Sequence, residues 1–261
     1  MKIVDISEKY FPTFACCFEE WSEEMVKAQV HRKAWFDHVK KHGMNAKLAI
    51  DTDGAVAGMI QYLPAEYSFV EGEGFYVIAC IWVYGYQDKG IGDRQKKSMG
   101  KALLEAAEAD MKQKGAKGIA AWGLALPFWM PSAFFKHFGY TVADSIGVQE
   151  LVWKPLADEV QPPKWLHTKK KPEKVPGKVT ITAFMNGWCT SFITAFNNFQ
   201  KAAIEFGDEV EFKIIRTLEP EIIAEYGITD AIYIDDEEIN LGPPPSYEDT
   251  VKMIRERIEK L

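Results

Sequence analysis

The sequence predicts an α/β (α+β) protein in two parts. A mixed central sheet flanked by helices is expected over residues 1–154, and a small unit of order βαβαββα over residues 178–261. Three observations lead to this prediction. A long apolar run at 74–84 leads through a small-residue turn into a helical pattern. A segment rich in proline and lysine, residues 155–177, then interrupts the pattern, and strand-like and helix-like stretches alternate again after it.

The composition is typical of a soluble protein, with 47% hydrophobic and 26% charged residues in a chain of 261. No apolar run is long enough to span a bilayer, and residues 1–5 lack a signal-peptide pattern. We therefore expect a cytoplasmic protein with no membrane partner. Residues 178–261 carry 16 acidic and 8 basic side chains, a balance that argues against a nucleic-acid partner. The cysteines lack metal-ligand spacing, so we expect no metal site; they are Cys16, Cys17, Cys80 and Cys189.

The first part begins with an expected edge strand at residues 2–6 and two expected helices. The helices are predicted at 8–21 and 22–42 from their helical spacing of apolar residues. Two strands follow, and Asp53-Gly54 between them supplies the positive φ that a tight hairpin needs. The apolar run at 74–84 has few polar breaks, which predicts a central strand buried on both faces.

The second half of this part continues from a turn at residue 95 into a helix that is predicted to end near Lys114. Gly115 then takes the position after the helix end that favours glycine. Pro131 suits the first turn of a short helix that ends near Phe138. The remaining strands of this part are expected at 118–124, 139–142 and 148–153.

Residues 155–177 are expected to form a semi-rigid linker because they hold five prolines and a run of three lysines. Trp165 and Leu166 are candidates for holding this linker to a domain surface. After it, the pattern predicts strands, helices and a terminal amphipathic helix. The expected strands are 179–185, 209–216, 231–234 and 238–241, and the expected helices are 189–206, 220–226 and 247–261.

The turn that precedes the helix near residue 100 is a candidate anion site. The first N–H groups of a helix have no partners within it, and the helix dipole places positive potential there. A second glycine-rich stretch, Gly90-Ile91-Gly92, lies just upstream, but Asp93 and Arg94 follow it where a helix would have to begin. We therefore place the anion site at the later turn.

That turn, Gln95-Lys96-Lys97-Ser98-Met99-Gly100, resembles the coenzyme loop of the GNAT superfamily of acyl-CoA-dependent N-acyltransferases, Gln/Arg-x-x-Gly-x-Gly/Ala. Ser98 replaces the first glycine of that pattern. The element order of residues 1–154 is also similar to the GNAT fold. The resemblance implies direct transfer of an acetyl group from acetyl-CoA to a primary amine, of a small molecule, peptide or protein, without a metal.

The same resemblance implies which residues bind the coenzyme. Backbone N–H groups from about residue 97 to 101 are expected to hold the pyrophosphate, and the end of the long strand is expected to pair with the pantetheine arm. The implied coenzyme residues are Ile81, Trp82, Val83, Gln95, Lys96, Lys97, Ser98, Met99, Gly100 and Lys101. Trp82, Tyr84, Trp122, Phe128 and Trp129 are candidates for lining an acceptor pocket.

The catalytic groups depart from the pattern of this family. The tyrosine that usually protonates the leaving thiolate in this family corresponds here to Phe135, which has no proton to donate. Ser132 and His137 are the candidates for an alternative acid. Glu66, Glu71 and Glu73, on the loop before the long strand, are the candidates for the base. A non-catalytic protein that binds or senses acyl-CoA is therefore an open alternative.

The final part resembles a thioredoxin-like domain. Asn186-Gly187-Trp188-Cys189 stands where that family has Trp-Cys-x-x-Cys, but the second cysteine position is Phe192. The cis-proline position of the family corresponds to Asp230 or Ala231. Dithiol exchange is thereby excluded, and a monothiol redox module acting through Cys189 stays open as a further alternative. The order of the two domains is similar to the YoaP-like acetyltransferases. The sequence leaves the acceptor amine and the oligomeric state open.

Overall fold

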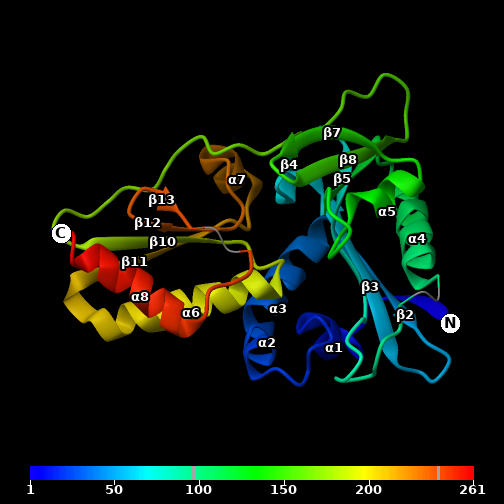
Figure 1. Cartoon of the computed structure of the whole chain (residues 1–261). Helices are drawn as coiled ribbons and strands as arrows, with labels where there is room; N and C mark the ends of the chain where they lie inside the picture. The colour runs from blue at the N-terminus through cyan, green and yellow to red at the C-terminus, as the bar shows by residue number, and fades with distance from the viewer. Residues whose placement is uncertain (96–97, 240–241) are drawn as a thin grey trace. The chain divides into compact units, whose positions relative to one another are not determined.

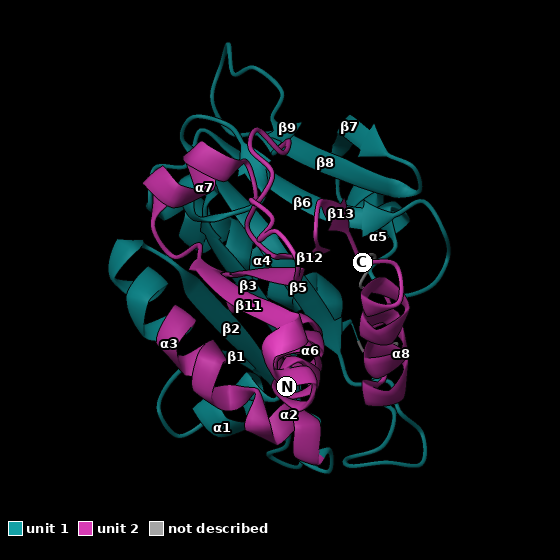
Figure 2. Cartoon of the chain, turned by 90° about the vertical axis from the view of Figure 1, so that its left-hand side faces the viewer, with its two compact units in different colours: residues 1–22, 36–166 teal, residues 23–35, 167–261 magenta. Residues whose placement is uncertain are grey.

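The computed structural model describes residues 1–95, 98–239 and 242–261, and the chain divides into two compact units (Figures 1 and 2). Unit 1 consists of Met1–Ser22 and Phe36–Leu166, and unit 2 of Glu23–Trp35 and His167–Leu261. Unit 2 therefore includes an N-terminal stretch, residues 23–35, as well as the C-terminal part of the chain.

Unit 1 is built on a mixed sheet whose described strands have the order β1-β2-β3-β5-β6-β8-β7. Neighbouring strands are antiparallel except β5 and β6, which are parallel. A separate short ladder joins β4 (Val70–Glu71) to β9 (Lys164–Trp165), so part of the expected linker pairs with unit 1. The bounds are β1 Lys2–Asp5, β2 Asn45–Ile50, β3 Val56–Pro64, β5 Phe75–Val83, β6 Gly118–Leu124, β7 Thr141–Ile146 and β8 Gln149–Pro155.

The hairpin between β2 and β3 forms as predicted. Gly54 has a φ of +86°, which glycine adopts without the steric cost of a Cβ. The Asp53 carboxylate accepts a hydrogen bond from the N–H of Ala55 at 3.1 Å, closing the turn.

The helices of the first fifty residues are shorter than predicted. They are α1 (Phe11–Ala15), α2 (Glu23–Lys27) and α3 (Gln29–Val39), with a 3₁₀ turn at Lys40–His42. The expected helix at 8–21 is wrong beyond Ala15 because Cys17 and Phe18 have φ values of 52° and 66°, outside the helical region. The expected helix at 22–42 is divided at Ala28 into α2 and α3.

Helix α4 (Met99–Gln113) packs along β2, β3 and β5 of unit 1 (Figure 1). Its buried side chains recur at helical spacing and form one core with the sheet. These residues are Met99, Leu103, Leu104, Ala107 and Met111. The short helix α5 (Ser132–His137) packs against β6 and β8.

Unit 2 has a four-stranded sheet in its described residues, with the order β11-β10-β12-β13. Its central strand β10 is buried along its whole length and is parallel to β11 and antiparallel to β12. The helices α6 and α8 cover one face, and Phe184 and Tyr233 contribute to a smaller core on the other. The bounds are β10 Val179–Met185, α6 Thr190–Phe206, β11 Val210–Arg216, α7 Pro220–Tyr226, β12 Ala231–Ile234, β13 Glu237–Glu238 and α8 Tyr247–Ile258.

The order βαβαββα predicted for this part of the chain is confirmed. The last strand is found at Glu237–Glu238, and the end of the predicted strand, residues 240–241, lies outside the described residues. In the described parts of both units, no helix combines the length and the apolar character needed to cross a membrane.

Candidate functional site

The two parallel strands of unit 1 diverge at their carboxyl ends. Pairing of β5 with β6 extends from Phe75 only as far as Ile78. Immediately beyond Ile78, the register of β5 against β3 shifts by one residue. Tyr62 is opposite Ile78, but its neighbour Gln61 is opposite Cys80. Ala79 is therefore an extra residue, a β-bulge, and such a bulge bends its strand. Beyond this bulge β5 no longer pairs with β6, which leaves a gap between the two strands.

The backbone of β5 beyond the bulge faces this gap. The N–H of Tyr84 donates to the carbonyl of Ala57 on β3 at 2.9 Å. Because bonding direction alternates along a strand, Trp82 also bonds toward β3, while Ile81 and Val83 point their N–H and C=O groups the other way. The end of β5 thus offers backbone donors and acceptors on the side from which β6 has departed.

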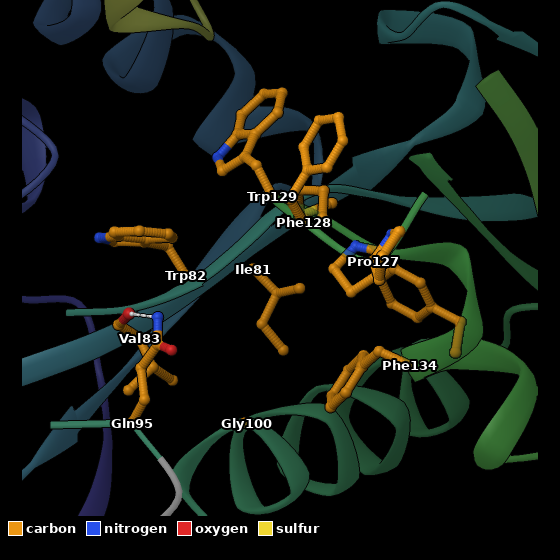
Figure 3. A pocket seen from close by; sticks show the side chains of 12 residues that line it. Ile81, Trp82, Val83, Gln95, Gly100, Pro127, Phe128, Trp129 and Phe134 are labelled. Atoms are coloured by element: carbon orange, nitrogen blue, oxygen red, sulfur yellow. Dashed lines mark hydrogen bonds between the residues drawn. The ribbon is translucent and has the colours of Figure 1, made fainter. Parts of the chain in front are cut away.

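Two side chains bond to carbonyls on this exposed edge. The indole N–H of Trp122, on β6, donates to the carbonyl of Ala79 at 2.8 Å. The side-chain amide of Gln95 donates to the carbonyl of Val83 at 3.3 Å (Figure 3). The backbone of Ile81 lies between these two contacts.

A cavity of about 440 Å³ occupies the gap (Figure 3). Its walls come from the end of β5, the start of α4, the loop at 127–131 and α5. Most of the lining side chains are apolar or aromatic, as in typical small-molecule pockets. The lining residues are Ile81, Trp82, Val83, Gln95, Gly100, Pro127, Phe128, Trp129, Met130, Pro131, Phe134 and Phe135. The structure therefore brings Ile81, Trp82, Val83, Gln95 and Gly100, expected from the sequence, to one cavity.

The N-terminus of α4 opens toward the same cavity at Gly100. The N–H of Ala102 donates to the carbonyl of Ser98 at 3.1 Å. The N–H groups of Met99, Gly100 and Lys101 come before this bond, in the first turn, where N–H groups have no acceptor within the helix. The side chain of Met99 is buried in the core, which leaves only its backbone for a ligand. The Lys101 ammonium lies 3.7 Å from Glu105 on the surface. Lys96 and Lys97 lie outside the described residues.

Ser98, in the position of the first family glycine, has a left-handed backbone with φ 58° and ψ 14°. This conformation costs a non-glycine residue about 1–2 kcal/mol. We expect Ser98→Gly to raise the free energy of unfolding, by about 1 kcal/mol after the added freedom of the unfolded chain is subtracted. Thermal and urea unfolding measure this gain.

Glu159→Gly is the matched control for this substitution. Glu159 is exposed and has the same φ of 58°. We expect both variants to gain stability by a similar amount. Loss of stability in Ser98→Gly would contradict the left-handed conformation at this position.

The packing of the upstream glycine stretch accounts for Gly90. Gly90 has a φ of +53°, and a Cβ there would collide with the hydroxyl of Tyr84. Arg94 closes this loop, since its N–H donates to the carbonyl of Tyr84 at 2.8 Å and its guanidinium lies 2.8 Å from Asp51. The glycine at position 90 is therefore explained by the packing of Tyr84.

The three candidate bases lie at the opposite end of β5 from the cavity. Glu66 is exposed in a 3₁₀ turn (Ala65–Tyr67), and Glu71 is exposed in β4. Glu73 is exposed and forms an ion pair of 2.8 Å with Lys117, whose hydrogen bond and charge lower the pKa of Glu73. None of the three is among the residues that line the cavity.

The two candidate acids are also outside the set of lining residues. The hydroxyl of Ser132 is buried and donates to the Glu150 carboxylate, which lies 2.6 Å from the Lys136 ammonium. The Lys136 and Ser132 hydrogen bonds lower the pKa of Glu150. His137 is exposed, with its ring against Phe138. Phe135, in contrast, is fully buried and does line the cavity.

No pattern in the sequence indicated the bulge at Ala79 or the hydrogen bond from the Gln95 side chain. The bulge is defined only by the register of β5 against β3, which a single strand does not reveal. The aromatic loop residues Phe128 and Trp129, proposed from the sequence as pocket residues, do line the cavity.

In unit 2, Cys189 is half-buried at the N-cap of α6, and Phe192 is buried in the core. The loop before Cys189 is held from two sides. The Asp230 carboxylate accepts from the N–H of Asn186 at 3.0 Å, and the Arg32 guanidinium donates to the carbonyl of Trp188. Burial raises the pKa of Asp230 to about 7. In the described residues of the chain, no group of three or more potential ligand side chains is arranged to hold a metal ion.

The comparisons with solved structures found similar chains that are described as N-acetyltransferases. Ribosomal-protein-alanine N-acetyltransferase from Brucella melitensis is 16% identical, over 60% of this chain and 100% of that chain, with a TM-score of 0.45. The GNAT family N-acetyltransferase YhbS from Escherichia coli, in complex with CoA, is 14% identical over 63% and 88%, with a TM-score of 0.43. A PaiA N-acetyltransferase from Thermoplasma acidophilum, in complex with coenzyme A, is 18% identical over 59% and 99%, with a TM-score of 0.41.

No protein-family model matches the sequence, and no curated protein matches it. Because the identities and TM-scores of the solved structures are low, we base the functional proposal on the geometry of this chain's own residues.

Proposed function

We propose that unit 1 is an N-acetyltransferase that moves an acetyl group from acetyl-CoA to a primary amine. The single observation that carries this proposal is the gap between β5 and β6, bordered at one end by the N-terminus of α4. This arrangement suits a long ligand whose amide groups lie along the open edge of β5 and whose anionic group lies at the N-terminus of α4.

The coenzyme arm would lie along the open edge of β5. An extended chain with amides can add to a strand edge through backbone hydrogen bonds, and the N–H and C=O of Ile81 are oriented for this. The apolar walls formed by Val83, Phe134 and Trp129 would exclude water from the arm. The N–H groups at 99–101 would receive the pyrophosphate, because helix N-termini favour anions.

The chemistry proposed is direct attack. The neutral amine nitrogen forms a bond to the thioester carbon, the carbon–sulfur bond breaks, and the coenzyme leaves as a thiolate; the nitrogen loses one proton to solvent as the amide forms, and the thiolate takes one up. A backbone N–H directed into the gap would stabilise the oxyanion as it forms. Phe135 supplies no proton, so water or another group would protonate the thiolate.

Two measurements on the full chain test this function. Calorimetric titration with acetyl-CoA and with CoA measures binding, and thiol release with a panel of primary amines measures transfer. We expect binding of both ligands and thiol release with at least one amine. Binding without release for any amine would favour a non-catalytic acyl-CoA-binding protein, and no binding at millimolar ligand would contradict both functions.

For unit 2 we propose a thioredoxin-like module of the YoaP-like kind that has no dithiol activity. Its strand order supports this proposal. Strand β11 lies at one edge and is parallel to β10, and β12 and β13 follow on the other side of β10 as antiparallel strands. The loop at Cys189 is held by Arg32 and Asp230, which favours a packing role. A Cys189 thiol that titrates well below about 8.5 in alkylation experiments would instead favour monothiol redox chemistry.

A further inference from the structure

A second cluster of aromatic side chains in unit 1 lies next to the cavity but is not part of the coenzyme gap. The ring of Tyr86 contacts those of Trp21, Trp82 and Tyr84, with centroid separations of 5.8, 6.2 and 5.5 Å. Trp82 also lines the cavity, so the cluster is continuous with it. The side chains of Trp21 and Tyr86 are 44% and 36% exposed, which leaves the cluster open to ligands from solution.

A partly buried carboxylate accompanies these rings. The hydroxyl of Tyr86 donates to the Glu19 carboxylate at 2.9 Å. Desolvation raises the pKa of Glu19, opposed by the Tyr86 hydrogen bond and by the charge of Lys89. Desolvation and the Glu19 hydrogen bond raise the pKa of Tyr86 to about 12, so Tyr86 stays a hydrogen-bond donor near neutral pH.

An ammonium group already lies in this cluster. The Nζ of Lys89 lies 4.1 Å from the centroid of the Trp21 ring, a close cation–π distance. Lys89 is carried by the loop at 85–94 that Arg94 closes. An aromatic face together with a carboxylate is the combination that recognises alkylammonium groups, and here it holds one from the chain itself.

We propose that Trp21, Tyr86 and Glu19 form a binding site for a primary alkylammonium with an unbranched aliphatic arm, and that Lys89 occupies this site until such a ligand displaces it. Trp21 would cover the ammonium, Glu19 would balance its charge, and Trp82 would border the path of the arm toward the cavity. The proposal that this site holds the acceptor amine rests on the proposed acetyl transfer. The proposal that it binds an alkylammonium group does not.

Binding of 1,5-diaminopentane to the full chain, measured by calorimetry without coenzyme, tests the site itself. We expect Lys89→Met to bind the diamine about fivefold more tightly than the unmodified chain, because the internal competitor is gone. Trp21→Leu, added to Lys89→Met, should weaken binding about tenfold, and Glu19→Gln in the same background should do the same.

Lys9→Met is the matched control, because Lys9 lies over the Tyr10 ring at 4.9 Å as another cation–π pair of unit 1. It should leave diamine binding unchanged. Equal affinity in the Lys89→Met and Lys9→Met variants, or full affinity after both Trp21→Leu and Glu19→Gln, would overturn the proposal.

Thiol release with acetyl-CoA then separates this proposal from the proposed function. If the diamine is the acceptor, Lys89→Met should lower its KM with kcat unchanged, and Trp21→Leu should raise the KM. Diamine binding without any thiol release would remove the acetyltransferase function but keep the alkylammonium site. Thiol release that is insensitive to Trp21→Leu, Glu19→Gln and Lys89→Met would keep the enzyme and overturn the acceptor role of the site, while diamine binding by calorimetry decides whether the alkylammonium site exists.

Discussion

Replacing Gly100 by tryptophan is expected to weaken acetyl-CoA binding by at least about a hundredfold, or about 2.7 kcal/mol, with the protein still folded. Gly100 lies at the start of α4 and lines the cavity, facing the Phe134 ring (Figure 3). An indole at this position would extend into the gap where the coenzyme arm and pyrophosphate are proposed to meet. Calorimetric titration measures the affinity, and thermal unfolding checks the fold.

Two controls make this prediction specific. Gly100→Ala places a Cβ 3.3 Å from the Phe134 ring, a tight contact that a small shift of the ring relieves. The higher helix propensity of alanine, about 1 kcal/mol, offsets much of the cost of this contact to folding. Because a methyl group fills far less of the cavity than an indole, acetyl-CoA affinity should change only severalfold. Ala109→Trp adds the same indole at an exposed position on α4 and should leave affinity unchanged. Normal binding by Gly100→Trp would contradict the placement of the coenzyme.

Replacing Asp230 by asparagine is expected to remove a pH-dependent loss of stability. The pKa of Asp230 is raised to about 7 by burial, above its ordinary value of 3.8. A raised pKa means that folding disfavours the charged form. Stability from this group is therefore complete below about pH 4 and falls as pH rises to about 7. A shift of about three units corresponds to about 4 kcal/mol.

The asparagine side chain keeps an oxygen that can accept from the N–H of Asn186, as the aspartate does at 3.0 Å. We expect Asp230→Asn to be more stable than the unmodified chain at about pH 8 and similar to it at about pH 4. Urea unfolding at a series of pH values measures the difference. A difference that stays constant between these pH values would contradict burial of the charge.

Asp236→Asn is the matched control in unit 2. Asp236 is exposed and pairs with Lys174 at 2.7 Å, and this hydrogen bond lowers the pKa of Asp236. Its contribution to stability is present above the ordinary pKa and is lost as pH falls, the opposite sign to Asp230. The control therefore separates the effect of the buried Asp230 carboxylate on stability from the effect of removing one negative charge from this acidic unit.

Several elements of the fold were predictable because local chemistry determines them. The Asp53-Gly54 turn, the end of α4 just before Gly115 and the order of elements in residues 178–261 all follow from short-range signals. The break after Ala15 was not predictable, because positive φ at Cys17 and Phe18 is unusual for those residue types and depends on tertiary packing.

In the candidate site, too, residues indicated by local sequence were predictable and contacts made through tertiary structure were not. Gln95 and Gly100 were proposed from the resemblance of residues 95–100 to the GNAT coenzyme loop, and both line the cavity. The position of Glu71 and Glu73 relative to the cavity depends on the length of β5, which separates them from its carboxyl end. Glu19 and Tyr86, far apart in sequence, meet only through tertiary structure, and no spacing indicated that contact.

Residue-resolved amide hydrogen exchange, with and without CoA, tests the central claim most directly. If the coenzyme lies along the open edge of β5 and against the start of α4, exchange should slow at the N–H groups of Ile81, Gly100 and Lys101. The N–H of Trp82, which bonds toward β3, should change little. Binding of CoA that leaves Ile81, Gly100 and Lys101 unprotected would contradict the account.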